Sequence, residues 1–241
     1  MTPATGRPRV ICHMAVSVDG RIVVDGWPDS AAAAVRREYE QVHRGYQPDG
    51  WICGRVTMEP FAGATRSEEE VAREQAREQV SGAMREDFVA ASSHDSFAFA
   101  IDPSGRLAWA SNDIDGDHVV AVLSERVSDE YLAFLRERGV SYLLAGARDV
   151  DLARALDKSA ARFGVRTIML EGGGRINGAM LRAGLVDEVS LLVAPVADGR
   201  VGMPALFDVD HGDARPWRLV LHGVERRTDD VLWLRYLVVG S

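Results

Sequence analysis

Residues 165–196 read VRTIMLEGGGRINGAMLRAGLVDEVSLLVAPV, and this stretch predicts a strand, a glycine turn, a helix and a second strand. The β-branched, apolar run 165–170 has the length of a buried strand. Apolar residues at helical spacing follow from Ile176 to Leu181, and Gly184 supplies a stop. The second apolar run, 189–196, predicts another strand. This order of elements is typical of an α/β protein with parallel strands.

The three consecutive glycines, Gly172, Gly173 and Gly174, lie between the first strand and the helix. Glycine lets backbone N–H groups approach an anion closely, and the positive end of a helix dipole favours negative charge there. A phosphate-bearing ligand is one interpretation, and a tight turn that needs positive φ is the other. Neither the pattern G-x-G-x-x-G nor G-x-x-x-x-G-K-[ST] is present, so the glycines alone name no cofactor.

Composition limits the class of protein. The chain has 241 residues, a net charge of −8, 46% hydrophobic residues and 27% charged residues, as in an ordinary globular protein. The acidic balance argues against a nucleic-acid surface, and no apolar run is long enough to predict a membrane span. Cys12 and Cys53 lie in apolar runs, which predicts two buried thiols and no zinc site. We therefore expect a cytoplasmic protein without a metal.

Strands and helices alternate along the rest of the chain. We predict a single domain over residues 9–241 after a flexible tail, 1–8, with a mixed, mostly parallel sheet flanked by helices. Two β runs, 217–224 and 231–239, predict a C-terminal antiparallel hairpin. The other predicted strands are 10–18, 51–53, 97–101, 119–123 and 141–145, and helices are predicted after a cap at Ser30, within the charged segment 63–92, over 129–139 and from Asp151.

Three segments together resemble a known family. They read AVSVDGRI (15–22), DGWICGRVT (49–57) and LEGGGRINGAMLRAGLVDEVSLLVAPV (170–196). In this order they resemble the reductase domain of the bacterial riboflavin-biosynthesis deaminase–reductase, which has the dihydrofolate-reductase-like fold. The resemblance implies an NADPH-dependent homodimer that transfers a hydride to C1′ of a ribosylaminopyrimidine phosphate, in its open-chain imine form.

The resemblance also implies which residues contact NADPH. Ala15 matches a position whose backbone meets the nicotinamide, and Ser124 matches a position near the adenosine 2′-phosphate. Thr57 and Ser124 can equally serve as helix caps. The remaining cofactor positions that the resemblance implies are Gly54, Arg55, Gly172, Gly173, Gly174, Arg175, Ile176 and Asn177.

Four further residues match substrate or catalytic positions. Glu171 matches a glutamate that contacts substrate, with a helix-entry carboxylate as the alternative. Asp19 lies in the matching S-x-D-G turn, where a direct catalytic part and a plain turn residue are both open. Arg44 matches a substrate arginine on a helix that is rich in arginine. His13 replaces a lysine and is either a proton donor or a hydrogen-bonded core residue.

One departure leaves the substrate open. The family usually continues D-x-P-x-L-T-x-R, with the arginine on the substrate phosphate, whereas this chain reads MEPFAGATR at 58–66. A reductase of the same fold that acts on another small carbonyl, imine or pterin-like substrate is therefore an alternative. A dinucleotide-binding protein without turnover is a third possibility. Dihydrofolate reductase itself is disfavoured, because Trp27 and Pro28 lie in a differently placed loop.

Overall fold

The computed structural model describes residues 6–77, 85–90, 94–209 and 216–239. Most of the predicted tail and parts of the predicted charged helix, 78–84 and 91–92, lie outside these ranges. The chain divides into two compact units. We call residues 9–48 with 167–241 the split unit, and residues 49–166 with 1–8 the middle unit, and each is described by itself. Whether these units together form the single predicted domain, residues 9–241, is still a prediction.

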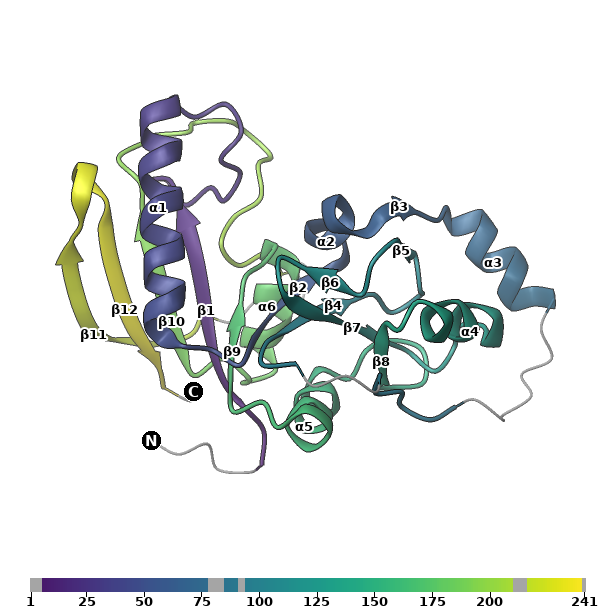
Figure 1. The fold of residues 1–241 in the computed structure, drawn as a ribbon. Coiled ribbons are helices and arrows are strands. Elements are labelled where there is room, and N and C mark those ends of the chain that lie inside the picture. The colour runs from purple at the N-terminus through teal and green to yellow at the C-terminus, as the bar shows by residue number, and fades with distance from the viewer. Residues whose placement is uncertain (1–5, 78–84, 91–93, 210–215, 240–241) are drawn as a thin grey trace. The chain divides into compact units, whose positions relative to one another are not determined.

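Among the residues that the structure describes, five strands form the sheet of the split unit, as can be followed in Figure 1. β1 (Arg9–Val16) lies between β9 (Thr167–Leu170) and β10 (Glu188–Val193), and both neighbours run parallel to it. β12 (Leu232–Val238) pairs antiparallel with β10, and β11 (Leu219–Arg226) pairs antiparallel with β12. The predicted C-terminal hairpin is thus confirmed, and a short 3₁₀ turn, η1 (Thr228–Asp230), joins its strands.

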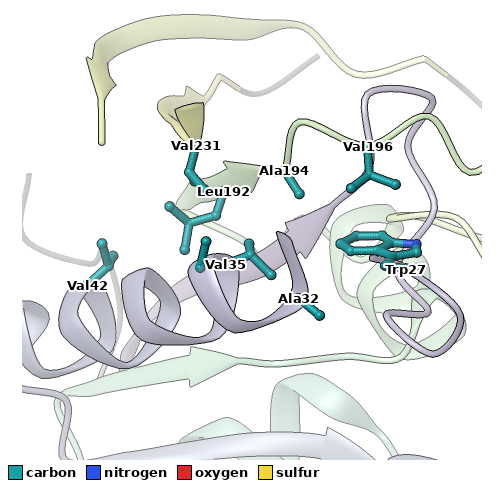
Figure 2. Packing of buried hydrophobic residues seen from close by; sticks show 9 residues of the cluster. Trp27, Ala32, Val35, Val42, Leu192, Ala194, Val196 and Val231 are labelled. Carbon is teal, nitrogen blue, oxygen red and sulfur yellow. The ribbon is translucent and has the colours of Figure 1, made fainter. Parts of the chain in front are cut away.

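Helix α1 (Asp29–Tyr46) packs its apolar residues on this sheet. Figure 2 shows the resulting cluster, in which Val35 and Val42 of α1 meet Leu192 of β10. Burying such side chains contributes about 1.5–3 kcal/mol each to folding. The predicted cap at Ser30 is wrong, because α1 already begins at Asp29 and its N-cap position is Pro28, without a capping side chain. Helix α6 (Gly174–Arg182) follows β9, as the glycine-led pattern predicted.

The middle unit has its own parallel strands. β2 (Gly50–Gly54), β4 (Phe97–Ile101), β7 (Asp117–Leu123) and β8 (Ser141–Leu144) pair in parallel in that order. β6 (Asp113–Ile114) pairs antiparallel with β7. β3 (Gly63–Thr65) and β5 (Leu107–Trp109) form a separate antiparallel pair. The parallel strands are continuously buried, which explains why their sequences are apolar without alternation.

The described helices of the middle unit are α2 (Arg55–Ala62), α3 (Glu68–Arg77), α4 (Asp129–Glu137) and α5 (Leu152–Phe163). Ser128 caps α4 and Asp151 caps α5 through their side chains. Residues 63–65, predicted within a charged helix, instead form β3. This part of the helix prediction was wrong, because glutamate and arginine spacing does not reveal that Gly63 starts a strand pairing with β5.

Both units combine parallel strands, covering helices and few antiparallel strands. The predicted class, a mixed and mostly parallel α/β fold with a C-terminal antiparallel hairpin, is therefore confirmed. Cys12 and Cys53 are both buried, and neither forms a disulfide. Within the described ranges, no helix has the length and apolar character needed to cross a membrane.

Candidate functional site

A cavity of about 230 Å³ opens in the split unit beside the carboxyl ends of β1 and β9. Ligands of α/β proteins bind at this end of parallel strands. The walls are apolar with a few polar groups, as in a small-molecule site. The residues that line it are Met14, Ala15, Ile22, Val24, Val35, Arg36, Tyr39, Glu40 and Glu171.

Glu171 is the carboxylate that directly follows β9. One of its oxygens, Oε1, lies 2.6 Å from Nδ1 of His43 on α1, and the Glu171 side chain is 14% exposed. Burial raises the pKa of the Glu171 carboxyl, while His43 and the Tyr39 side chain oppose the shift. The position at the cavity agrees with the predicted substrate role, and the raised pKa lets the carboxyl hold a proton closer to neutral pH than an exposed glutamate does.

His13 lies in the core of the split unit and is fully buried. Its Nδ1 is 3.1 Å from Oγ of Ser190, and its Nε2 is 3.2 Å from the carbonyl oxygen of Tyr39. The His13 and Tyr39 rings also stack, with centroids 4.1 Å apart. Burial lowers the pKa of His13 to about 4. Of the two interpretations of this residue, the structure matches the hydrogen-bonded core residue.

Asp19 joins two loops of the split unit. Its carboxylate accepts hydrogen bonds from the Ser17 hydroxyl at 2.7 Å and from the backbone N–H groups of Asp198 and Gly199, each at 2.9 Å. These hydrogen bonds, with that from Ser17 first, lower the pKa of Asp19 to about 2. A carboxylate held ionised in this way is a poor proton donor, so its geometry favours the turn role over the catalytic one.

The three glycines serve different purposes. Gly172 adopts φ +96°, which an L side chain rarely adopts, and its peptide bond to Gly173 is cis. Gly173 is the N-cap of α6, with no side-chain cap. A Cβ on Gly174 would lie 2.2 Å from the carbonyl oxygen of Ala205, so glycine is required there for close packing. The turn interpretation therefore holds, and the uncapped start of α6 also suits an anion.

The other predicted residues of α6 differ in accessibility. Arg175 is exposed and Ile176 is partly buried. Asn177 is fully buried, and its side-chain amide donates to the carbonyl oxygen of Leu206 at 3.0 Å. Together with the hydrogen bond from Asp208 N–H to the Gly174 carbonyl, this contact fastens the 204–208 segment to α6. The side chain of Asn177 thus has a packing role.

A second group of predicted residues lies in the middle unit. Gly54 is the N-cap of α2 and again has no side-chain cap. Thr57 lies inside the first turn of α2, so the cap alternative for Thr57 is wrong, and the Arg55 guanidinium pairs with Glu59 along the same helix. Ser124 is fully buried, and its hydroxyl donates to the carbonyl oxygen of Pro103 at 2.5 Å. Ser124 does not cap α4, because this helix begins at Asp129, five residues later, and its N-cap is Ser128.

Sequence reasoning missed most of the residues at the cavity, among them a polar group on α1, and chose Arg44, which follows His43 of that group. Arg36, Tyr39 and His43 follow one another at spacings of three and four on α1, which places them on one helix face. Arg36 and Tyr39 line the cavity, whereas Arg44, the predicted substrate arginine, does not. The helical spacing alone defines this face of α1. Only the position of Glu171, after β9, shows that this face lies at the cavity.

Comparison with known proteins shows the family to which the chain belongs. A family model described as the RibD C-terminal domain matches residues 8–233. The 2,5-diamino-6-ribosylamino-4(3H)-pyrimidinone 5′-phosphate reductase of Methanothermobacter thermautotrophicus is 42% identical over 86 residues, or 36% of this chain and 39% of that protein. The reductase of the same name from Aquifex aeolicus is 32% identical over 87 residues, or 36% of this chain and 38% of that protein. The matched regions thus span less than half the length of these curated relatives.

Two solved structures share the fold. A pyrimidine reductase-like protein from Corynebacterium diphtheriae superimposes with a TM-score of 0.69 at 20% identity, covering 97% of this chain and 93% of that one. RibD from Acinetobacter baumannii superimposes with a TM-score of 0.62 at 20% identity, covering 98% of this chain and 60% of that one. The family model covers nearly the whole chain, and we conclude that this protein belongs to the RibD C-terminal domain family.

Proposed function

We propose that this protein is a reductase that transfers a hydride from NADPH to C1′ of a ribosylaminopyrimidine phosphate. The observation that carries the proposal is the cavity with Glu171 on its wall and Ala15 beside it, at the carboxyl ends of two parallel strands. Family membership and the curated relatives, which are named as reductases of such a phosphate, support the same reaction.

Within the split unit, one helix start suits the proposed cofactor. α6 begins behind a glycine that offers no side-chain cap, and a helix start of this kind suits an anion. We assign the phosphate contacts to Gly173 and Gly174 at α6, and the contact predicted for Gly54 at the start of α2, in the middle unit, stays a prediction. Bound NADPH would supply the hydride, and the protein would align the acceptor and exclude water. Ser124 is omitted, because its hydroxyl already donates to a backbone carbonyl. Asn177 stays a predicted contact, since its amide nitrogen donates to Leu206 but its buried Oδ1 has no hydrogen-bond partner among the described residues.

Arg36 takes the place of the missing motif arginine in this proposal. It lines the cavity with Glu171, and within the described residues no hydrogen bond or ion pair to its guanidinium is found. A guanidinium in this position suits a phosphate, which it can bind through two parallel hydrogen bonds. The substrate phosphate would therefore bind at α1.

The test is binding followed by turnover. We expect tight NADPH binding, weaker NADH binding, and oxidation of NADPH only when the pyrimidine phosphate is present. Gly173→Asp should abolish NADPH binding while leaving the fold intact, because it places a carboxylate where the cofactor phosphate would lie. Gly6→Asp is the matched control, since it adds the same charge at a site with no neighbouring atoms within 4 Å. Equal NADPH affinity in both variants would contradict the assignment.

A different acceptor remains the second candidate, because MEPFAGATR replaces the motif that would bind the substrate phosphate. NADPH binding without oxidation by the pyrimidine phosphate, but with oxidation by another carbonyl or imine, would favour it. Binding without turnover on any acceptor would favour the non-catalytic alternative. We also infer a homodimer that works in the cytoplasm, because two buried cysteines outside any disulfide suit a reducing compartment.

A further inference from the structure

His43 is a titratable residue beside the cavity, and the proposed reaction has not yet assigned it a role. It lies in the last turns of α1, and its Nδ1 is 2.6 Å from Oε1 of Glu171. The His43 side chain is 23% exposed and that of Glu171 is 14% exposed. Of the two groups, His43 is thus nearer to solvent and Glu171 nearer to the interior.

Several other groups act on this pair. On α1, the Tyr39 side chain favours the ionised form of Glu171 and Glu40 disfavours it, while Arg36 lines the same cavity. Two residues of β1 feel the pair electrostatically. In addition to burial, Glu171 raises the pKa of the buried Cys12 thiol, and His43 lowers the pKa of His13. Neither β1 residue competes as a proton donor, because burial raises the pKa of Cys12 and lowers that of His13.

We propose that His43 is a positioning residue that orients Glu171 toward the cavity and returns a proton to it after each turnover. This inference rests on the proposed reductase function. The hydride and its electron pair add to C1′ of the open-chain imine, and the C=N π pair moves to nitrogen. That nitrogen takes the proton of the Glu171 carboxyl, which gives the amine and oxidised nicotinamide. Glu171 then regains a proton from Nδ1 of His43 while Nε2 takes one from a solvent hydronium ion, so that one solvent proton is consumed per turnover. Proton exchange of the imidazole with water then returns His43 to its Nδ1–H form.

A purely structural hydrogen bond is the competing explanation, and His43→Asn separates the two. The asparagine amide can still donate to Glu171 from near the position of Nδ1, but it cannot pass on a proton. We expect KM to stay within about twofold and kcat to fall roughly 100-fold, the usual lower range for acid–base groups. His94→Asn is the matched control, because His94 belongs to the middle unit and is not among the residues that line the cavity, so both constants should stay unchanged.

The pH profile gives a second readout. Activity that needs protonated Glu171 is lost as pH rises through the pKa of this carboxyl. His43 lowers that pKa, so the alkaline limb should move to higher pH in His43→Asn. Added imidazole should restore part of the rate of His43→Ala, which guards against a variant that is merely misfolded. Wild-type kcat and pH profile in His43→Asn would overturn the proposal.

The last measurement needs no turnover. Carbon-13 NMR of labelled glutamate follows the Glu171 carboxyl in the ligand-free protein, with Glu171→Gln to assign the signal. A higher pKa in His43→Asn than in the wild type supports the pair, and an unchanged pKa overturns it. If the wild type binds NADPH but does not reduce the pyrimidine phosphate, the proposed function fails by itself, and the NMR titration still decides whether His43 and Glu171 share their titration.

Discussion

Arg36 and Arg44 carry the same charge on the same helix, yet only Arg36 lines the cavity beside Glu171. The two residues are eight positions apart, about 12 Å along an α-helix. A substrate phosphate near Glu171 can therefore be reached by one of them and not by the other without a large displacement. This difference gives a test of the substrate class at the scale of a single side chain.

Arg36→Met should raise KM for the pyrimidine phosphate roughly 10- to 100-fold, since a charge-assisted hydrogen bond contributes about 1.5–3 kcal/mol. Methionine keeps much of the side-chain length, so the apolar packing changes little. Steady-state kinetics with the phosphorylated and dephosphorylated pyrimidine measure the effect, and only the phosphorylated form should lose affinity. Arg44→Met is the control, and an equal loss in both variants would mean that α1 merely attracts anions through its net charge.

At the scale of single residues, the sequence predicted which residues belong to the site better than it predicted their hydrogen-bond partners. Glu171 was predicted as a substrate contact because it matches a glutamate of the family that the sequence resembles, and the structure puts it at a cavity. The alternatives for His13 stayed open because its hydrogen-bond partners, Ser190 and Tyr39, lie 177 and 26 residues away along the chain. Sequence spacing cannot show that both ring nitrogens are engaged by such distant groups.

At the scale of elements, the strand–glycine–helix order of residues 165–196 was predicted because each piece has its own periodicity. The reason for the third glycine could not be predicted. Gly174 is required by Ala205 and Asp208, which belong to a segment with no helical or strand pattern. Two hydrogen bonds then hold that segment against α6, one from Asp208 N–H to the Gly174 carbonyl oxygen and one from the Asn177 amide to the Leu206 carbonyl oxygen.

Gly174→Ala should lower the free energy of unfolding by about 1–3 kcal/mol, because an added methyl group in a fully packed place forces the backbone to shift. Its Cβ would lie 2.2 Å from the Ala205 carbonyl oxygen and 2.7 Å from Oδ2 of Asp208. Gly45→Ala is the matched control, since Gly45 lies within α1 with no atoms near its Cβ and should stabilise by about 0.5–1 kcal/mol. Urea titration of both variants measures the difference in the free energy of unfolding. Equal values for the two variants would show that the 204–208 segment can shift to accommodate the methyl group at no cost.

At the scale of the whole molecule, the C-terminal hairpin leaves apolar side chains uncovered. Leu221 and Val224 of β11 are 55% and 57% exposed, and Val220 and Leu232 are each 40% exposed. Among the described strands, β11 pairs only with β12, so one of its edges has no strand beside it. Open edges and clustered apolar surface are typical of sites where another chain binds.

We therefore expect a homodimer that contacts through this hairpin, with a mass by light scattering of twice the 26.3 kDa chain. The double variant Leu221→Lys, Val224→Lys should be a monomer. Its dimer would lose the apolar contact of these two side chains and would also have to bury their ammonium groups against those of the second copy. Val201→Lys is the control, since Val201 is 98% exposed in a loop outside the hairpin. If the double variant stays dimeric, the interface does not lie on this hairpin. If the wild type is a monomer, the inferred homodimer is wrong, and the hairpin face has no assigned partner.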